Sequence, residues 1–130
     1  MPKLSEGQAR MFTEPYYGVA STVRPDGSPH QTVVWVDYDG QNVVFNTAEG
    51  RAKPRFLRAN PHAGLSVVDP GDPYRWVSVS GPVEISEEGA AEHINELAHK
   101  YTGRDFNLPA GQQRLIVRIK PERVTAVGLD

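Results

Sequence analysis

Cysteine is absent from the 130 residues of the chain. Its absence excludes a disulfide framework, a thiolate nucleophile, a zinc ribbon and a cysteine-ligated iron–sulfur cluster. Long hydrophobic runs are missing as well, since no stretch approaches the roughly 18 apolar residues that a membrane-spanning helix needs. The N-terminal segment holds no apolar run typical of a secretory signal. We therefore expect a cytoplasmic protein that does not interact with membranes.

A metal site and a hydrolytic triad also lack support in the sequence. His93 and His99 stand six residues apart, and no pair of histidines has the spacing of four that places two ligands on one helix face. The carboxylates show no glycosidase-like pair, and no serine stands in a nucleophile elbow. No glycine pattern of a Walker or dinucleotide-binding loop is present. We expect neither a bound metal nor a nucleoside triphosphate site.

The length fits a single domain covering residues 1–130. The 12 glycines and 11 prolines indicate many turns, which favours short strands over a helical bundle. β-branched and aromatic residues gather in short segments, separated by turn signals such as 25–27 (PDG) and 39–40 (DG). The segments expected to form strands are 16–24, 30–38, 42–47, 63–68, 75–85, 114–120 and 123–128.

Three helices are expected between these strands, at residues 4–13, 51–59 and 87–101. Ser5 and Ser86 are the predicted side-chain caps of the first and third helix. Pro54 fits the second helix only in its first turn, where a missing N–H costs nothing. The pair 81–82 (GP) predicts a bulge or bend in the longest strand. About six strands with one long helix favour a small, closed or partly closed β-barrel.

The basic segment 51–58 contains four cations and no acidic residue: Arg51, Lys53, Arg55 and Arg58. Removing these four from the net charge of −2 leaves the rest of the chain at −6. A helix that begins here presents free backbone N–H groups and a partial positive charge. With the hydroxyl of Thr47, the cations Arg51 and Lys53 suit a phosphate monoester or diester. An exposed helix with solvated charges fits the same spacing.

Aromatic residues accompany the predicted strands, among them Trp35, Phe45, Tyr74 and Trp76. Such residues pack in cores and interfaces, or flank a planar ring system. Aromatics on a barrel beside a basic helix also fit a platform for single-stranded nucleic acid. The acidic remainder of the chain opposes that interpretation, because binding a polyanion requires positive charge along its track. We therefore expect no nucleic-acid partner.

Four segments together resemble the pyridoxamine 5'-phosphate oxidase-like superfamily of FMN-binding split barrels. They follow one another across nearly the full chain: DGSPHQTVVWVDYDGQNVVFNT, AEGRAKPRFLRANPHAGLSVVD, DPYRWVSVSG and RLIVRIKPERVT. Within the superfamily, RAKPRFLRANP, DPGDPYR and KYTGRD resemble the B-type oxidoreductases that depend on the deazaflavin coenzyme F420. The resemblance implies a mainly β fold, a six-stranded antiparallel split β-barrel with short flanking helices, which forms a homodimer through its sheet.

The same resemblance implies a flavin-like cofactor in a groove between two subunits. The phosphate-binding run of the family falls on Arg51 and Lys53, with Asn46 and Thr47 on the strand end just before it. The strand beside the cofactor ring falls on His30, Gln31, Thr32 and Val33, and its partner strand on Arg75, Trp76 and Val77. All eleven residues are therefore candidate cofactor contacts.

The implied activity is that of an oxidoreductase that uses reduced F420 to transfer hydride to a conjugated small-molecule acceptor, such as a quinone or tetrapyrrole. No catalytic triad is required, because the chain orients the cofactor ring and excludes water. His30 is a candidate proton donor, beside Tyr74 and solvent. Arg55 and Arg58 suit the longer anionic tail of F420. The alternatives are an FMN-dependent enzyme of the pyridoxamine 5'-phosphate oxidase type and a barrel that binds a cofactor or oligonucleotide without catalysis.

Overall fold

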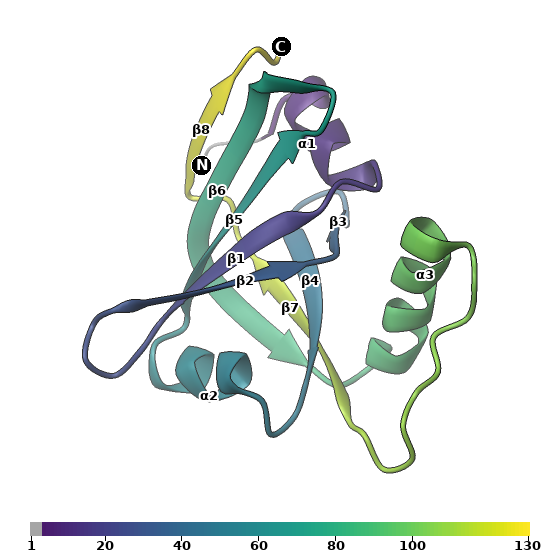
Figure 1. The fold of residues 1–130 in the computed structure, drawn as a ribbon. Helices are drawn as coiled ribbons and strands as arrows, with labels where there is room; N and C mark the ends of the chain where they lie inside the picture. Colours follow the sequence, from purple (N-terminus) through teal and green to yellow (C-terminus); the bar gives the residue numbers. More distant parts are fainter. Residues whose placement is uncertain (1–3) are drawn as a thin grey trace.

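The computed structural model describes residues 4–130, which form a curled antiparallel sheet with three helices packed around it (Figure 1). The strands are β1 (Gly18–Val23), β2 (Pro29–Val34), β3 (Val36–Tyr38), β4 (Val43–Ala48), β5 (His62–Asp69), β6 (Asp72–Ser86), β7 (Arg114–Ile119) and β8 (Arg123–Val127). The helices are α1 (Glu6–Thr13), α2 (Ala52–Ala59) and α3 (Ala90–Thr102). The predicted mainly β split barrel is confirmed as the fold class.

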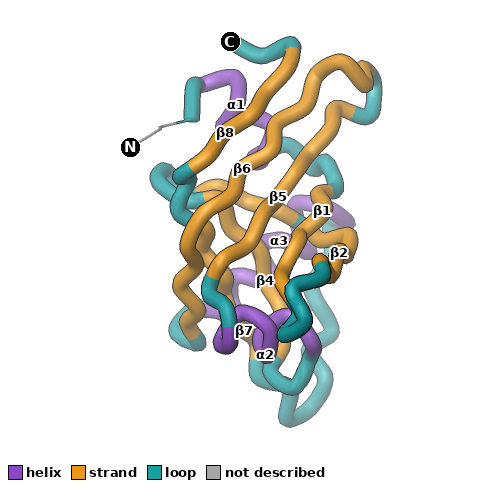
Figure 2. Tube along the Cα trace, turned by 90° about the vertical axis from the view of Figure 1, so that its left-hand side faces the viewer, coloured by secondary structure: helices purple, strands orange, loops and turns teal. Residues whose placement is uncertain are grey.

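The strands are ordered β2-β1-β5-β6-β7-β4-β3, with β8 beside β6. The long strand β6 joins the two halves, because residues up to Pro82 pair with β5 and residues from Val83 pair with β7. Figure 2 shows β5, β6 and β8 side by side along one half. Residues 4–130 form eight strands where about six were expected. One reason is that the predicted strand 30–38 divides at Trp35, so that β2 pairs with β1 and β3 with β4.

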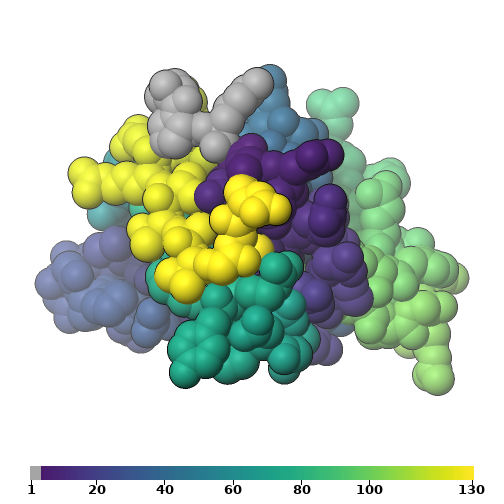
Figure 3. Space-filling view, turned by 90° about the horizontal axis from the view of Figure 1, so that it is seen from above, coloured from purple at the N-terminus to yellow at the C-terminus, as the bar shows by residue number. Residues whose placement is uncertain are grey.

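Alternate positions of the strands fill the interior of the barrel. Strand side chains with no exposed surface include Phe45, Leu65, Val79 and Val117. The helices complete the same core from two ends, through Met11 and Phe12 of α1 and Leu57 of α2 (Figure 1). Each fully buried side chain of this size contributes about 1.5–3 kcal/mol. Seen from the α1 end, the N-terminal helix lies against the C-terminal residues (Figure 3).

The helix ends follow the local sequence in two cases and depart from it in one. Ser5 caps α1 as predicted, and a capping box with Gln8 completes the first turn. Pro54 lies in the first turn of α2, as expected. The predicted start of the third helix is wrong, because α3 follows Gly89 and Ser86 ends β6, where its Oγ accepts a hydrogen bond from Arg118 at 2.7 Å. Within residues 4–130, no helix combines the length and apolar character that crossing a membrane requires.

The predicted irregularity at 81–82 is a close approach between two backbone segments. A Cβ atom on Gly81 would lie 1.9 Å from the carbonyl oxygen of Lys120, far inside a normal contact distance. Hydrogen bonds from Lys120 N to Pro82 O (2.9 Å) and from Glu122 N to Ser80 O (3.0 Å) fix the backbone on both sides. No bulge interrupts the pairing here; instead, β6 passes at this point from one half of the sheet to the other.

We expect Gly81→Ala to lower the free energy of unfolding by about 2 kcal/mol or more, because the methyl group overlaps a hydrogen-bonded backbone segment. Gly64→Ala in β5 is the matched control, since its Cβ would lie 3.7 Å from the nearest heavy atom. Urea unfolding of the two variants and the parent chain checks this. A Gly81→Ala protein as stable as the Gly64→Ala protein would contradict the close approach.

Candidate functional site

A pocket of about 250 Å³ lies where the end of β2, the start of α2 and one side of α3 meet. Four of its lining residues are polar or cationic and are called the cationic wall: Asn46, Arg51, Lys53 and Arg114. The other seven are apolar or aromatic and are called the aromatic wall: Tyr17, Val33, Val34, Trp35, Ile94, Leu97 and Phe106. The two groups meet where the Phe106 ring lies against the Arg114 guanidinium. None of the described residues that line the pocket is acidic. This division suits a ligand with a planar apolar part and an anionic end.

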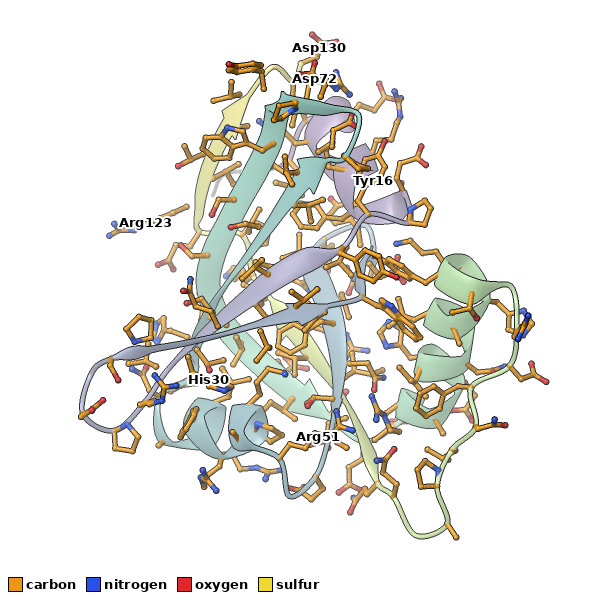
Figure 4. The ribbon with its side chains drawn as sticks, viewed as in Figure 1. Tyr16, His30, Arg51, Asp72, Arg123 and Asp130 are labelled. Atoms are coloured by element: carbon orange, nitrogen blue, oxygen red, sulfur yellow. The ribbon has the colours of Figure 1, made fainter. Side chains whose placement is uncertain are left out.

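Lys53 reaches from α2 across to β2. Its Nζ donates a hydrogen bond to Thr32 Oγ1 at 2.9 Å, so two residues predicted from separate motifs are in contact. Partial burial of the amine, followed by the nearby charges of Arg51 and Arg114, lowers the pKa of Lys53. A negatively charged ligand would offset both effects. Figure 4 shows Arg51 at the junction between β4 and α2.

Arg114 is the most constrained cation of the pocket. Its side chain begins at the first residue of β7 and is buried. Nε donates to Asn46 Oδ1 at 2.8 Å, Nη1 donates to Gln112 Oε1 at 3.0 Å, and the guanidinium lies over the ring of Phe106, 5.1 Å from its centroid. Burial, and then the charge of Arg51, lowers the pKa of Arg114 to about 10. Among the described residues, no carboxylate forms an ion pair with it.

Asn46 and Thr47 are neighbours in β4, and their side chains therefore point to opposite faces of the sheet. Asn46 lines the pocket, in register with Ile116 of β7. Thr47 shares the face of the core residue Phe45, is only 1% exposed, and its hydroxyl makes no hydrogen bond within residues 4–130. The structure brings Asn46 to the site and leaves Thr47 behind it.

Of the four predicted residues of β2, two lie at the pocket and two do not. Thr32 contacts Lys53, and Val33 lines the pocket with 69% of its surface exposed. His30 and Gln31 do not line the pocket. The His30 ring packs edge-on against Phe56, with 5.3 Å between centroids. Partial burial, Arg24 and Lys53 lower the pKa of His30, which favours the neutral ring and does not suit a proton donor.

The predicted set on β6 lies away from this pocket within one chain. Three strand boundaries separate β6 from β2, and none of Arg75, Trp76 and Val77 lines the pocket. Arg75 Nε pairs with Asp69 at 3.2 Å, and Val77 is fully buried in the core. Trp76 lies on the other face of the strand, between its partners Val68 and Val127.

The rest of the basic segment also faces away from the pocket. Arg58 forms a two-point ion pair with Glu49, which precedes the segment in sequence. Arg55 is exposed, and its guanidinium lies over the ring of Phe56, 5.2 Å from the centroid. Neither cation lines the pocket. The four cations of the basic segment therefore form two groups. Arg51 and Lys53 line the pocket, whereas Arg55 and Arg58 do not.

Sequence reasoning did not find Arg114 or the support behind the aromatic wall. Trp35 stacks on Tyr101 of α3, with centroids 5.3 Å apart and 9° between the planes. Tyr101 in turn donates a hydrogen bond to Tyr16 O (2.6 Å) and accepts one from Val36 N (2.9 Å). The alternation in 114–120 (RLIVRIK) is a signal that Arg114 shares a face with Ile116, but only the pairing with β4 identifies that face.

No three His, Asp or Glu side chains in the described part of the chain are grouped as a metal ion would require. The family model described as pyridoxamine 5'-phosphate oxidase matches residues 4–128. The chain belongs to this family. The sequence motifs indicate the F420-dependent branch of this family, and the names of two relatives include F420 as well.

A curated relative from Mycobacterium tuberculosis (strain CDC 1551 / Oshkosh), named as an F420-dependent biliverdin reductase, is 24% identical over 122 residues, which is 94% of this chain and 87% of that protein. A solved structure named F420 reductase superposes with a TM-score of 0.84 at 34% identity, covering 94% of this chain and 98% of the other. A conserved hypothetical protein of Mycobacterium tuberculosis gives 0.77 at 27% identity, covering 96% and 85%. These similarities relate the chain to split-barrel oxidoreductases.

We expect Arg51→Gln to raise the pKa of Lys53 toward its usual value, because it removes one of the two cations that disfavour the protonated amine. Side-chain NMR of Lys53 during an alkaline titration measures this. Arg58→Gln is the control, since Arg58 is paired with Glu49 and does not line the pocket. If Arg51→Gln leaves the pKa of Lys53 where it is in the parent chain, the two cations do not share one wall.

Proposed function

We propose that this chain is an oxidoreductase that binds coenzyme F420 and reduces a conjugated organic acceptor of the quinone or tetrapyrrole type. The observation that carries the proposal is one pocket whose lining combines three cations and no acidic residue with aromatic and apolar side chains. When bound, the reduced coenzyme supplies the hydride. The residues of the chain bind the anionic end, orient the ring and limit the access of water.

The fit of the coenzyme follows from the two walls. Arg51, Lys53 and Arg114 provide charge-assisted donors for a phosphodiester, and the start of α2 adds its partial positive charge. Val33 and Trp35 offer an apolar surface for the tricyclic ring. Burial and then the charges of Arg51 and Arg114 lower the pKa of Lys53, and an anion would offset both effects. An anionic ligand would therefore stabilise the pocket electrostatically, whereas a neutral ligand would not.

A homodimer would complete the groove. At about 250 Å³ the pocket is smaller than the roughly 300–1,000 Å³ typical of sites for molecules of drug size. Val33 and Tyr17, at its rim, are 69% and 59% exposed, and Val19 pairs with Val33 on the same sheet face. A second copy packed on this face would cover these side chains. We propose that Arg75 and Trp76 act on the cofactor of the other subunit, whereas buried Val77 only positions their strand.

The choice of F420 over FMN does not depend on Arg55 and Arg58. Their positions away from the pocket remove the argument that they bind a longer tail. F420 is favoured by the relatives at 34% and 24% identity whose names include it. FMN is the second candidate, because its phosphate monoester would find the same three cations. If the chain binds the cofactor but catalyses no reaction, its function would be that of a cofactor carrier.

The proton that accompanies the hydride is proposed to come from solvent. His30 does not line the pocket, and its lowered pKa favours the neutral ring. Tyr74 is 77% exposed, and its strand β6 lies three positions from β2 in the sheet. Within one chain, neither side chain lines the pocket. The proposal therefore assigns binding and orientation to the residues of the pocket, and the supply of the proton to solvent.

We expect the double variant Arg51→Ala/Lys53→Ala to weaken F420 binding by about 10- to 100-fold or more, because each lost charge-assisted contact costs about 1–3 kcal/mol. Titration of tryptophan fluorescence measures the affinity, since Trp35 lines the pocket. The same titration with FMN decides between the two cofactors, and a salt series with a single-stranded oligonucleotide tests the non-enzymatic alternative.

Arg55→Ala/Arg58→Ala is the matched control for this experiment, since it removes two cations from the same segment outside the pocket. We expect it to bind F420 with an affinity close to that of the parent chain. Equal losses in both double variants would indicate only a general effect of charge. Unchanged affinity in Arg51→Ala/Lys53→Ala would place the anionic end of the ligand elsewhere.

A further inference from the structure

A line of polar side chains runs behind the cationic wall and connects four elements. It begins at Asp37 of β3, passes through His93 of α3 and Asn46 of β4, and ends at Arg114 of β7. The distances are 3.7 Å from Asp37 Oδ2 to His93 Nε2, 3.0 Å from His93 Nδ1 to Asn46 Nδ2, and 2.8 Å from Asn46 Oδ1 to Arg114 Nε. Only Asn46 and Arg114 line the pocket.

The orientation of the Asn46 amide follows from its neighbours. Arg114 has donors and no acceptor, so the atom of Asn46 that faces Nε must be the oxygen. The amide nitrogen then faces Ala90 O at 3.0 Å and His93 Nδ1 at 3.0 Å, one acceptor for each of its two protons. His93 Nδ1 must therefore be unprotonated. In the neutral ring the proton is on Nε2, which is buried, makes no hydrogen bond within residues 4–130 and lies 3.7 Å from Asp37 Oδ2.

We infer that His93 is a positioning residue for the anion-binding wall, acting on Arg114 through Asn46. The inference rests on the proposed function in one respect, that Arg114 contacts the anionic end of the ligand. His93 accepts the second amide proton of Asn46 and thereby holds the amide oxygen toward Arg114. Gln112 holds Nη1 of the same guanidinium. Two of its nitrogens are then fixed by the protein, and Nη2 is left for a ligand oxygen.

Burial of Asn46 and Arg114 makes the loss of either group's hydrogen bonds costly. Asn46 is 9% exposed and Arg114 is 7% exposed, so water cannot readily replace a lost partner of either group. Without an acceptor at position 93, one N–H of Asn46 would be buried and unpaired, and only Ala90 O and Arg114 Nε would still hold the amide. The amide would then be less firmly fixed, which weakens the contact that orients the guanidinium. The role of His93 is thus specific to the acceptor at Nδ1.

Two variants at position 93 separate positioning from simple packing. His93→Leu fills similar space and removes the acceptor, whereas His93→Asn places an amide oxygen near the position of Nδ1. We expect His93→Leu to accelerate hydrogen exchange at Arg114 Nε by about tenfold or more and to weaken binding of inorganic phosphate by about 3- to 10-fold. His93→Asn should restore both to near the parent values. NMR of the Arg114 Nε–H signal, identified by its loss in Arg114→Gln, provides both readouts.

The exchange rate is measured without ligand, so it tests the positioning role even if phosphate or F420 fails to bind and the proposed function is wrong. Parent-like exchange in His93→Leu, or equal effects of His93→Leu and His93→Asn, would overturn the inference. If His93→Leu does not fold, nitrogen NMR of His93 in the parent chain decides instead. A proton on Nε2 at neutral pH supports the inference, and a proton on Nδ1 overturns it.

Discussion

Three cations share one pocket wall without a carboxylate among the lining residues, and this uncompensated charge is the constraint on which the site depends. The fold holds the charges in place against their mutual repulsion. Arg114 is fixed by Asn46 and Gln112, and Lys53 by Thr32. Burial first, and then the charge of the neighbouring cations, lowers the pKa of Lys53 and of Arg114. A wall of this kind is stabilised by an anion, which is the physical reason for assigning it a binding role.

The barrel supplies the rigidity that such a site needs. The β4–β7 pairing sets the distance between Asn46 and Arg114, and the stack of Trp35 on Tyr101 fixes the opposite wall. Helix α3 contributes to both walls, since it carries Tyr101 as well as the histidine that contacts Asn46. The apolar face around Val33 remains exposed in the single chain. In the proposed complex, this domain would hold the anionic end of the cofactor firmly and leave the ring accessible to an acceptor.

Local sequence patterns predicted the elements well where capping and turn chemistry decided them, as at Ser5 and Pro54. They also identified Lys53, because a cation at a strand-to-helix junction is readable from neighbouring residues alone. They failed at Ser86, whose hydroxyl is used by a residue from another strand. Arg114 was missed for a related reason: its place in the wall results from β-sheet pairing over a separation of 68 residues in sequence. Long-range pairing, and not local propensity, decides which lone cation reaches a pocket.

The crystal structure of the protein with bound F420 tests the central claim most directly. The account predicts that the phosphate of the coenzyme lies within hydrogen-bond distance of Lys53 and Arg114, with its ring against Val33 and Trp35. A coenzyme whose anionic end lies instead on the face of Arg55 and Arg58, with the pocket empty, would contradict it.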